Sequence, residues 1–118
     1  MFGFEFDDPL DSGRSDGLVE AYETYVREGG PGFFDADDLE YIATVYFESG
    51  RLAEALDVVD RQIAQSPGSS DPWMRRGVLL NHLDRHEEAL HAYDEALAVN
   101  PVDVETLVNR GITLDTIG

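Results

Sequence analysis

The chain is 118 residues long, which suits one domain with its own core and is too short for two. Apolar residues make up 42% and charged residues 28%, as in globular proteins, so the composition excludes disorder throughout. The absence of cysteine excludes disulfides, thiolate catalysis and cysteine-ligated metal sites. No apolar run approaches the ~18 residues of a membrane span. Residues 1–8 lack the basic start and apolar stretch of a signal peptide, which predicts a cytoplasmic protein.

The charge balance is strongly acidic. Twenty-five acidic residues against eight basic ones leave a net charge of −17, and a field of that sign repels nucleic-acid phosphates and anionic lipids. We therefore expect neither nucleic acid nor a membrane surface as a partner. All eight basic residues are arginine, which a GC-rich genome or a salt-rich, halophilic cytoplasm would produce. The halophilic interpretation predicts that added salt stabilises the fold, because it screens acidic repulsion and the sequence suggests few close ion pairs.

The first 35 residues are expected to form an arm and a cap. Residues 1–15 are predicted to be an acidic, flexible arm, in which Phe2, Phe4 and Phe6 alternate. The alternation permits an extended segment that docks into an apolar groove, and the alternative is a disordered tail with incidental aromatics. Residues 16–29 have an amphipathic helical pattern closed by a glycine-rich linker, so we expect an N-terminal capping helix within residues 16–35.

The remaining chain contains an internal repeat. Five further helices are expected near 36–49, 52–65, 70–83, 86–99 and 104–117, and no sheet, which defines an all-α fold of about six helices. One constant shift along the chain places Pro67 on Pro101 and Ala55 on Ala89. The repeat units are 36–69, 70–103 and a partial unit 104–118. The same register counts back from Ala55 to Ala21, which suggests that the capping helix is the second half of a degenerate repeat.

These spacings resemble the tetratricopeptide repeat, whose pattern over about 34 residues is W-x₂-L-G-x₂-Y, then A-x₃-F, A and P. The second unit matches this pattern at Trp73, Gly77, Leu80, Ala89, Tyr93, Ala96 and Pro101. The first unit departs from it at Gln62, where alanine is usual. The resemblance implies a right-handed α-solenoid of antiparallel helix pairs, whose concave groove holds a peptide or helix from a partner protein.

Periodicity identifies residues expected to line the groove. They lie one step round each first helix from the core face, and with Arg75 they are Glu40, Thr44, Phe47, Met74, Arg75, Val78, Asn81, Val108, Ile112 and Asp115. One subclass of the family binds the C-terminal carboxylate of heat-shock chaperones through lysine and asparagine. The corresponding positions here are Glu40, Thr44, Arg75, Glu105 and Asn109. Because acids replace the required lysines, a chaperone tail is not expected as the partner.

Apparent chemical sites in the sequence have simpler explanations. His82 and His86 have metal-ligand spacing, but the turn at Asp84 and Arg85 separates them onto two helices, so we expect no metal site. The acids of residues 35–40 lack the glycine and distant glutamate of a calcium loop and suit a helix N-terminus. No set of nucleophile, base and orienting group is visible. We therefore expect neither a cofactor nor enzymatic activity.

The last helix, at 104–117, has apolar residues on more than one face, with Leu107, Gly111 and Leu114 at the positions that pair with a second helix. This pattern predicts that the natural protein is longer and that the chain forms a homodimer through this helix. The alternative is a monomer whose last helix tolerates exposure. The sequence as a whole thus predicts a protein-interaction module that binds a basic and apolar partner peptide, with self-association as the alternative function.

Overall fold

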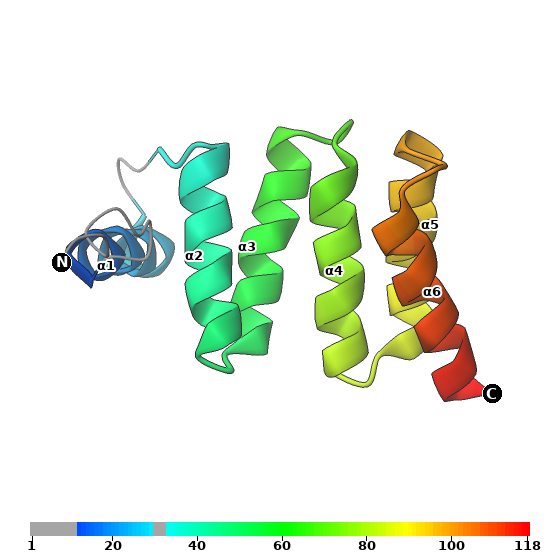
Figure 1. Ribbon diagram of the computed structural model, residues 1–118. Helices are drawn as coiled ribbons and strands as arrows, with labels where there is room; N and C mark the ends of the chain where they lie inside the picture. Colours follow the sequence, from blue (N-terminus) through cyan, green and yellow to red (C-terminus); the bar gives the residue numbers. More distant parts are fainter. Residues whose placement is uncertain (1–11, 30–32) are drawn as a thin grey trace, which may run out of the picture.

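A computed structural model describes residues 12–29 and 33–118, which form an all-α fold with no strand in those ranges. The helices are α1 (Ser12–Glu28), α2 (Ala36–Glu48), α3 (Leu52–Gln65), α4 (Ser70–His82), α5 (His86–Val99) and α6 (Val104–Ile117). Helices α2 to α5 follow one another as a row of neighbouring helices, and α6 packs on α5 (Figure 1). The predicted fold class is therefore confirmed, with helix bounds close to those expected. Residues 1–11 of the predicted arm and part of the glycine-rich linker lie outside the described residues, whereas residues 12–15, which were assigned to the flexible arm, belong to α1.

The two complete repeats turn in the same way. Gly50 and Asp84, which occupy equivalent positions in successive repeats, both have a positive φ, 77° and 62° respectively. Glycine adopts this conformation freely, and aspartate is among the few other residues that tolerate it. The backbone N–H that follows each of them donates back to the preceding helix, from Arg51 to the oxygen of Tyr46 and from Arg85 to that of Leu80, both at 2.8 Å. The turn geometry therefore repeats with the sequence.

The core lies between the two helices of each pair and between successive pairs. In the first repeat, Leu39, Ala43 and Tyr46 of α2 are buried together with Ala55 and Val59 of α3. The second repeat buries the equivalent residues Gly77, Leu80, Ala89 and Tyr93, whereas Trp73 is half-buried, and the ring of Tyr93 packs directly against the backbone at Gly77. Gln62, the departure from the family pattern, is buried, and its Oε1 accepts a hydrogen bond from Arg75 Nη1 at 3.2 Å. In the two complete repeats the predicted core face is thus the one that the structure buries, whereas Leu107 and Leu114 of the partial third unit are exposed.

Ion pairs also recur with the period of the sequence repeat. Arg76 Nε lies 2.8 Å from Asp60 Oδ1 and joins α4 to α3, and Arg110 Nε lies 2.8 Å from Asp94 Oδ1 and joins α6 to α5. Every arginine side chain that the structure describes has an acidic partner within ion-pair distance. The expectation of few close ion pairs was therefore wrong. Spacing within helices could reveal Arg51–Glu54 and Arg85–Glu88, but the pairs between helices form only when the repeats stack.

Helix α1 contacts the first repeat differently from the way that later helices contact each other. Figure 1 shows α1 crossing α2, whereas α3 lies alongside α4. Tyr22 is buried and its ring meets that of Phe34 edge-on at 5.4 Å, whereas Ala21 is exposed. Ala55 and Ala89, the two residues in register with Ala21, are fully buried.

Among the described helices, α1 included, none combines the length and apolarity that crossing a membrane requires.

Candidate functional site

A cavity of about 300 Å³ opens between the first helices of the repeats. Thr44 and Phe47 of α2 form one wall, and Met74 and Val78 of α4 form the other. Its lining is completed by Ala43, Val59, Arg75, Leu79 and Glu105. The surface of the cavity is therefore mostly apolar, with charged groups from Arg75 and Glu105.

Local hydrogen bonds hold the cavity walls in place. The Thr44 hydroxyl donates to the carbonyl oxygen of Glu40 at 2.9 Å, which turns its methyl group away from the helix backbone. The ring of Phe47 meets that of His82 edge-on, with centroids 5.5 Å apart, and His82 Nδ1 lies 2.9 Å from the carbonyl oxygen of Val78. On the opposite side, Asn109 Nδ2 lies 3.6 Å from the sulfur of Met74. Helices α2, α4 and α6 thus all contribute to the positions of the walls.

The charge of the cavity is determined by Arg75 and the acids around it. Arg75 Nη2 lies 3.5 Å from Glu40 Oε1, while Nη1 donates to Gln62. Both terminal nitrogens of the guanidinium are thus engaged, and the charge of Arg75 is balanced by that of Glu40. Glu105 remains as a further carboxylate at the α6 side. The cavity therefore favours cationic groups near its rim and apolar groups at its floor.

The structure gathers some of the predicted groove residues and separates others. Thr44, Phe47, Met74, Arg75 and Val78 line the cavity together, and Glu40 reaches it through Arg75. Asn81 does not line it, because its Oδ1 lies 2.5 Å from His86 Nδ1 at the α4–α5 turn. The three α6 residues Val108, Ile112 and Asp115 lie outside the cavity and are exposed.

Four lining residues were missed by the sequence prediction of the groove. Ala43, Val59 and Leu79 belong to the core face and reach the cavity from its edge. Periodicity assigns a residue to one face and so overlooks side chains at the border between two faces. Glu105 was not among the predicted groove residues, although the sequence analysis placed it at one of the positions that correspond to the chaperone-tail ligands of the family, and that correspondence already pointed to it.

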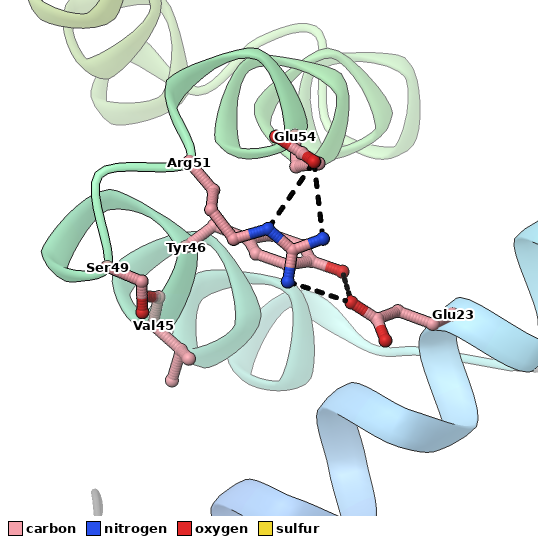
Figure 2. A network of polar contacts seen from close by, with 6 residues as sticks. All are labelled: Glu23, Val45, Tyr46, Ser49, Arg51 and Glu54. Carbon is pink, nitrogen blue, oxygen red and sulfur yellow. Dashed lines mark hydrogen bonds and ion pairs between the residues drawn. The ribbon is translucent and has the colours of Figure 1, made fainter.

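A second cavity, of about 380 Å³, lies where α1 meets the α2–α3 turn. Figure 2 shows the carboxylate of Glu23, from α1, facing both Tyr46 and Arg51: the Tyr46 hydroxyl donates to Glu23 Oε2 at 2.7 Å, and Arg51 Nη1 lies 3.3 Å from the same oxygen. Arg51 also binds Glu54, and its guanidinium stacks 4.9 Å from the centre of the Tyr46 ring. Burial, and then the hydrogen bond to Glu23, raise the pKa of Tyr46 well above its ordinary value of 10.0. This network fastens α1 to the first repeat.

The histidines have separate surroundings. His82 ends α4 and His86 begins α5, and His91 lies 3.8 Å from Glu95 on α5. Within residues 12–29 and 33–118, no group of three histidine, aspartate or glutamate side chains is arranged to hold a metal ion.

The sequence model for the tetratricopeptide repeat matches residues 70–103. The chain is similar to two peroxisomal targeting signal receptors, with 29% identity over 77 residues in that of Kluyveromyces lactis and 27% over 84 residues in that of Candida albicans. These alignments cover 65% and 71% of this chain, and in each case 14% of the receptor. The chain thus spans about one seventh of the length of these curated relatives.

Solved structures share the fold. The crystal structure of MamA superposes with a TM-score of 0.74 and 17% identity, over 100% of this chain and 67% of that chain. The first tetratricopeptide repeat domain of Spaghetti (RPAP3), bound to the HSP90 peptide SRMEEVD, superposes with a TM-score of 0.71 and 17% identity, over 92% of this chain and 83% of that one. At this identity the likeness establishes the arrangement of helices.

Proposed function

We propose that the chain, in which residues 70–103 match the tetratricopeptide repeat model, is a protein-interaction module whose cavity between α2, α4 and α6 binds a partner peptide or helix. The observation that carries the proposal is the cavity itself, an apolar floor bordered by Glu40 and Glu105. Apolar surface that is concave and partly rimmed by charge is the usual form of a binding site. The structure of RPAP3 with its peptide supports a role of this kind for the fold.

The chemistry of the cavity favours a partner with apolar and basic side chains. Val78 and Met74 offer a surface for an apolar side chain, while the net charge of −17 attracts a cationic segment and speeds its encounter. An acidic peptide such as SRMEEVD finds no unpaired arginine in the cavity, because Arg75 is engaged by Glu40 and Gln62. The partner class therefore differs from that of the RPAP3 domain.

The proposal is tested with three labelled peptides: Lys-Lys-Leu-Phe-Lys-Lys, Glu-Glu-Leu-Phe-Glu-Glu and SRMEEVD. Fluorescence anisotropy should show saturable binding of the first and none of the two acidic peptides. The variant Glu40→Lys/Glu105→Lys should reverse that preference, since it frees Arg75 and adds two cations at the rim.

The matched control is Glu20→Lys/Glu87→Lys, which changes the net charge equally at exposed positions on α1 and α5. It should weaken binding of the basic peptide only slightly and should not create binding of SRMEEVD. If both double variants behave alike, the peptide responds to overall charge and the cavity is not its site. If the basic peptide does not bind the parent, the proposed partner class is wrong.

Self-association is the second candidate function. Its support is the exposed apolar surface of α6, where Leu107 and Leu114 are 47% and 41% exposed. A homodimer through this helix would cover that surface. The large negative charge opposes pairing of two copies, so we rank this function below peptide binding. Light scattering, which reports whether the chain is a monomer or a dimer, distinguishes self-association from peptide binding by a monomer.

A cytoplasmic location and the division of the chain at residues 15 and 35 stay predictions of the sequence.

A further inference from the structure

Gln62 of α3 is a polar residue in a core position that the second repeat gives to alanine. Its side chain is 5% exposed, and Ala96, at the same position one repeat later, is fully buried. A buried amide that lacks a hydrogen-bond partner destabilises a fold, so this glutamine requires a compensating contact. That contact is with Arg75, whose Nη1 donates to Gln62 Oε1 at 3.2 Å. Since alanine fills the equivalent position without such a requirement, filling the core does not explain the pair.

The guanidinium of Arg75 is held from two sides. Nη1 donates to Gln62 on α3, and Nη2 lies 3.5 Å from Glu40 Oε1 on α2. The side chain of Glu40 is 58% exposed, so this ion pair is weak by itself and can move together with the arginine. Gln62, by contrast, is fixed in the core. The buried amide therefore determines where the guanidinium lies, and the exposed carboxylate follows it.

The second repeat provides an internal comparison. One repeat later in the chain, the positions of Glu40, Gln62 and Arg75 are occupied by Met74, Ala96 and Asn109. The contact between the two first helices recurs there, because Asn109 Nδ2 lies 3.6 Å from the sulfur of Met74. Both of these side chains are uncharged, and the corresponding core residue is alanine. Glutamine thus accompanies arginine and alanine accompanies asparagine, as expected when the glutamine serves to hold the arginine.

We propose that Gln62 is a positioning residue that sets the charge preference of the cavity between α2, α4 and α6, because it holds Arg75 in the cavity wall and withholds this cation from acidic ligands. The inference rests on the proposed function of that cavity as a peptide site. Arg75 lines the cavity, so a guanidinium released from Gln62 would stay within reach of a bound peptide. Once released, it would attract carboxylates and repel basic side chains. With Gln62 in place, the cavity accepts apolar and basic segments and rejects acidic ones.

The test is Gln62→Leu, which keeps a side chain of similar size in the core and removes the acceptor. In fluorescence anisotropy with the peptides named above, the variant should bind SRMEEVD at least about tenfold more tightly than the parent does, because a freed guanidinium can pair with a carboxylate. Its affinity for the basic peptide should fall at least about threefold. Gln62→Ala, which copies the second repeat, should change the preference in the same direction. Thermal melting of both variants shows whether they are folded.

Two further variants separate a released arginine from a change in packing. Arg75→Asn copies Asn109 and removes the cation, so Gln62→Leu in this background should leave the ratio of the two affinities unchanged. The matched control is Gln65→Leu, which removes the other glutamine at the end of α3, whose Nε2 donates to the carbonyl oxygen of Phe34. This control should leave the affinities for both peptides as they are in the parent.

The outcomes distinguish this inference from the proposed function. If the parent does not bind the basic peptide but Gln62→Leu binds SRMEEVD, the proposed partner class is wrong and the role of Gln62 stands. If the parent binds the basic peptide and the folded Gln62→Leu chain still rejects SRMEEVD, the role of Gln62 is overturned while the proposed function stands. Binding of neither peptide to either chain overturns both.

Two other results overturn the role of Gln62 alone. An equal change of preference in the Arg75→Asn background would show that the arginine has no part in the effect. Failure of both Gln62→Leu and Gln62→Ala to fold would assign the residue to the stability of the core.

Discussion

Tyr93 of α5 packs against Gly77 of α4 so closely that a Cβ atom on the glycine would lie 2.6 Å from Cδ1 and 2.8 Å from Cζ of the ring. Tyr93 is 1% exposed and belongs to the continuous core of both repeats. A glycine in a helix is intrinsically unfavourable, so its presence here is explained by the approach of the ring. The contact sets the spacing of the helix pair and makes Gly77 sensitive to any added side chain.

Gly77→Ala and Gly111→Ala form a matched pair of substitutions. The first should lower the free energy of unfolding by about 1–3 kcal/mol, because the ring of Tyr93 must move within a packed core. The second should raise it by about 0.5–1 kcal/mol, since alanine is the better helix former and its methyl group meets no neighbour within 4 Å. Urea unfolding of both variants measures the difference. Equal effects of the two substitutions would contradict the assigned role of Tyr93.

Removal of the Tyr46 hydroxyl should loosen the attachment of α1. Tyr46→Phe loses the 2.7 Å hydrogen bond to Glu23 and should cost about 0.5–1.5 kcal/mol. Hydrogen exchange should increase in α1 and change little in α5. The matched control is Thr44→Val, which removes a hydroxyl from the same helix whose hydrogen bond goes to the carbonyl oxygen of Glu40 within α2. If hydrogen exchange in α1 rises as much in this control, the specific role of the Tyr46–Glu23 contact is disproved.

The tyrosines predict a loss of stability at alkaline pH. Burial is the largest cause that raises the pKa of Tyr22, Tyr46 and Tyr93 above 10.0 in the folded chain. The unfolded chain therefore releases these protons first, so their contribution is complete below pH 10 and is lost as the pH rises through the folded pKa values. The free energy of unfolding should be lower above pH 10 than at pH 8. Tyr46→Phe should reduce the slope of this free energy against pH. An unchanged slope would show that other groups cause the loss.

Added salt should still raise the melting temperature, although every described arginine side chain is paired. The pairs are largely exposed, and such pairs contribute between 0 and about 1 kcal/mol each, so screening them costs little. The 25 acids outnumber the eight bases, and screening of their repulsion acts over the whole chain. Melting in 0.1 M and in molar sodium chloride measures the balance. A lower midpoint at high salt would contradict both this prediction and the halophilic interpretation.

His82→Ala and His86→Ala should each change stability by no more than about 1 kcal/mol. Their ring contacts are with Phe47, with the carbonyl oxygen of Val78 and with Asn81, all at or near the surface. Thermal melts with zinc and with a chelator provide the measurement. A zinc-dependent rise in the parent that both variants lose would establish a metal site.

The sequence by itself determined the helices and their repetition. Helical spacing and the period of the repeat are local properties, and Pro67, Pro101 and the turn residues limit each helix without help from distant contacts. The core face followed for the same reason: Leu39, Ala43 and Tyr46 share one side of a helix whatever lies opposite. The pattern at Leu107, Gly111 and Leu114 likewise indicated a face made for another helix.

Only the tertiary structure decided which charged side chains pair and which residues line the cavity together. Arg76 pairs with Asp60 and Arg110 with Asp94 because the stacked repeats bring successive helices together, and no spacing along one helix contains that information. Arg75 is not available to an acidic ligand, because its guanidinium already contacts Glu40 on α2 and Gln62 on α3. The crossing of α1 over α2 also departs from the register that Ala21 suggested. Each of these depends on the relative placement of separate helices, which side-chain packing sets after the helices have formed.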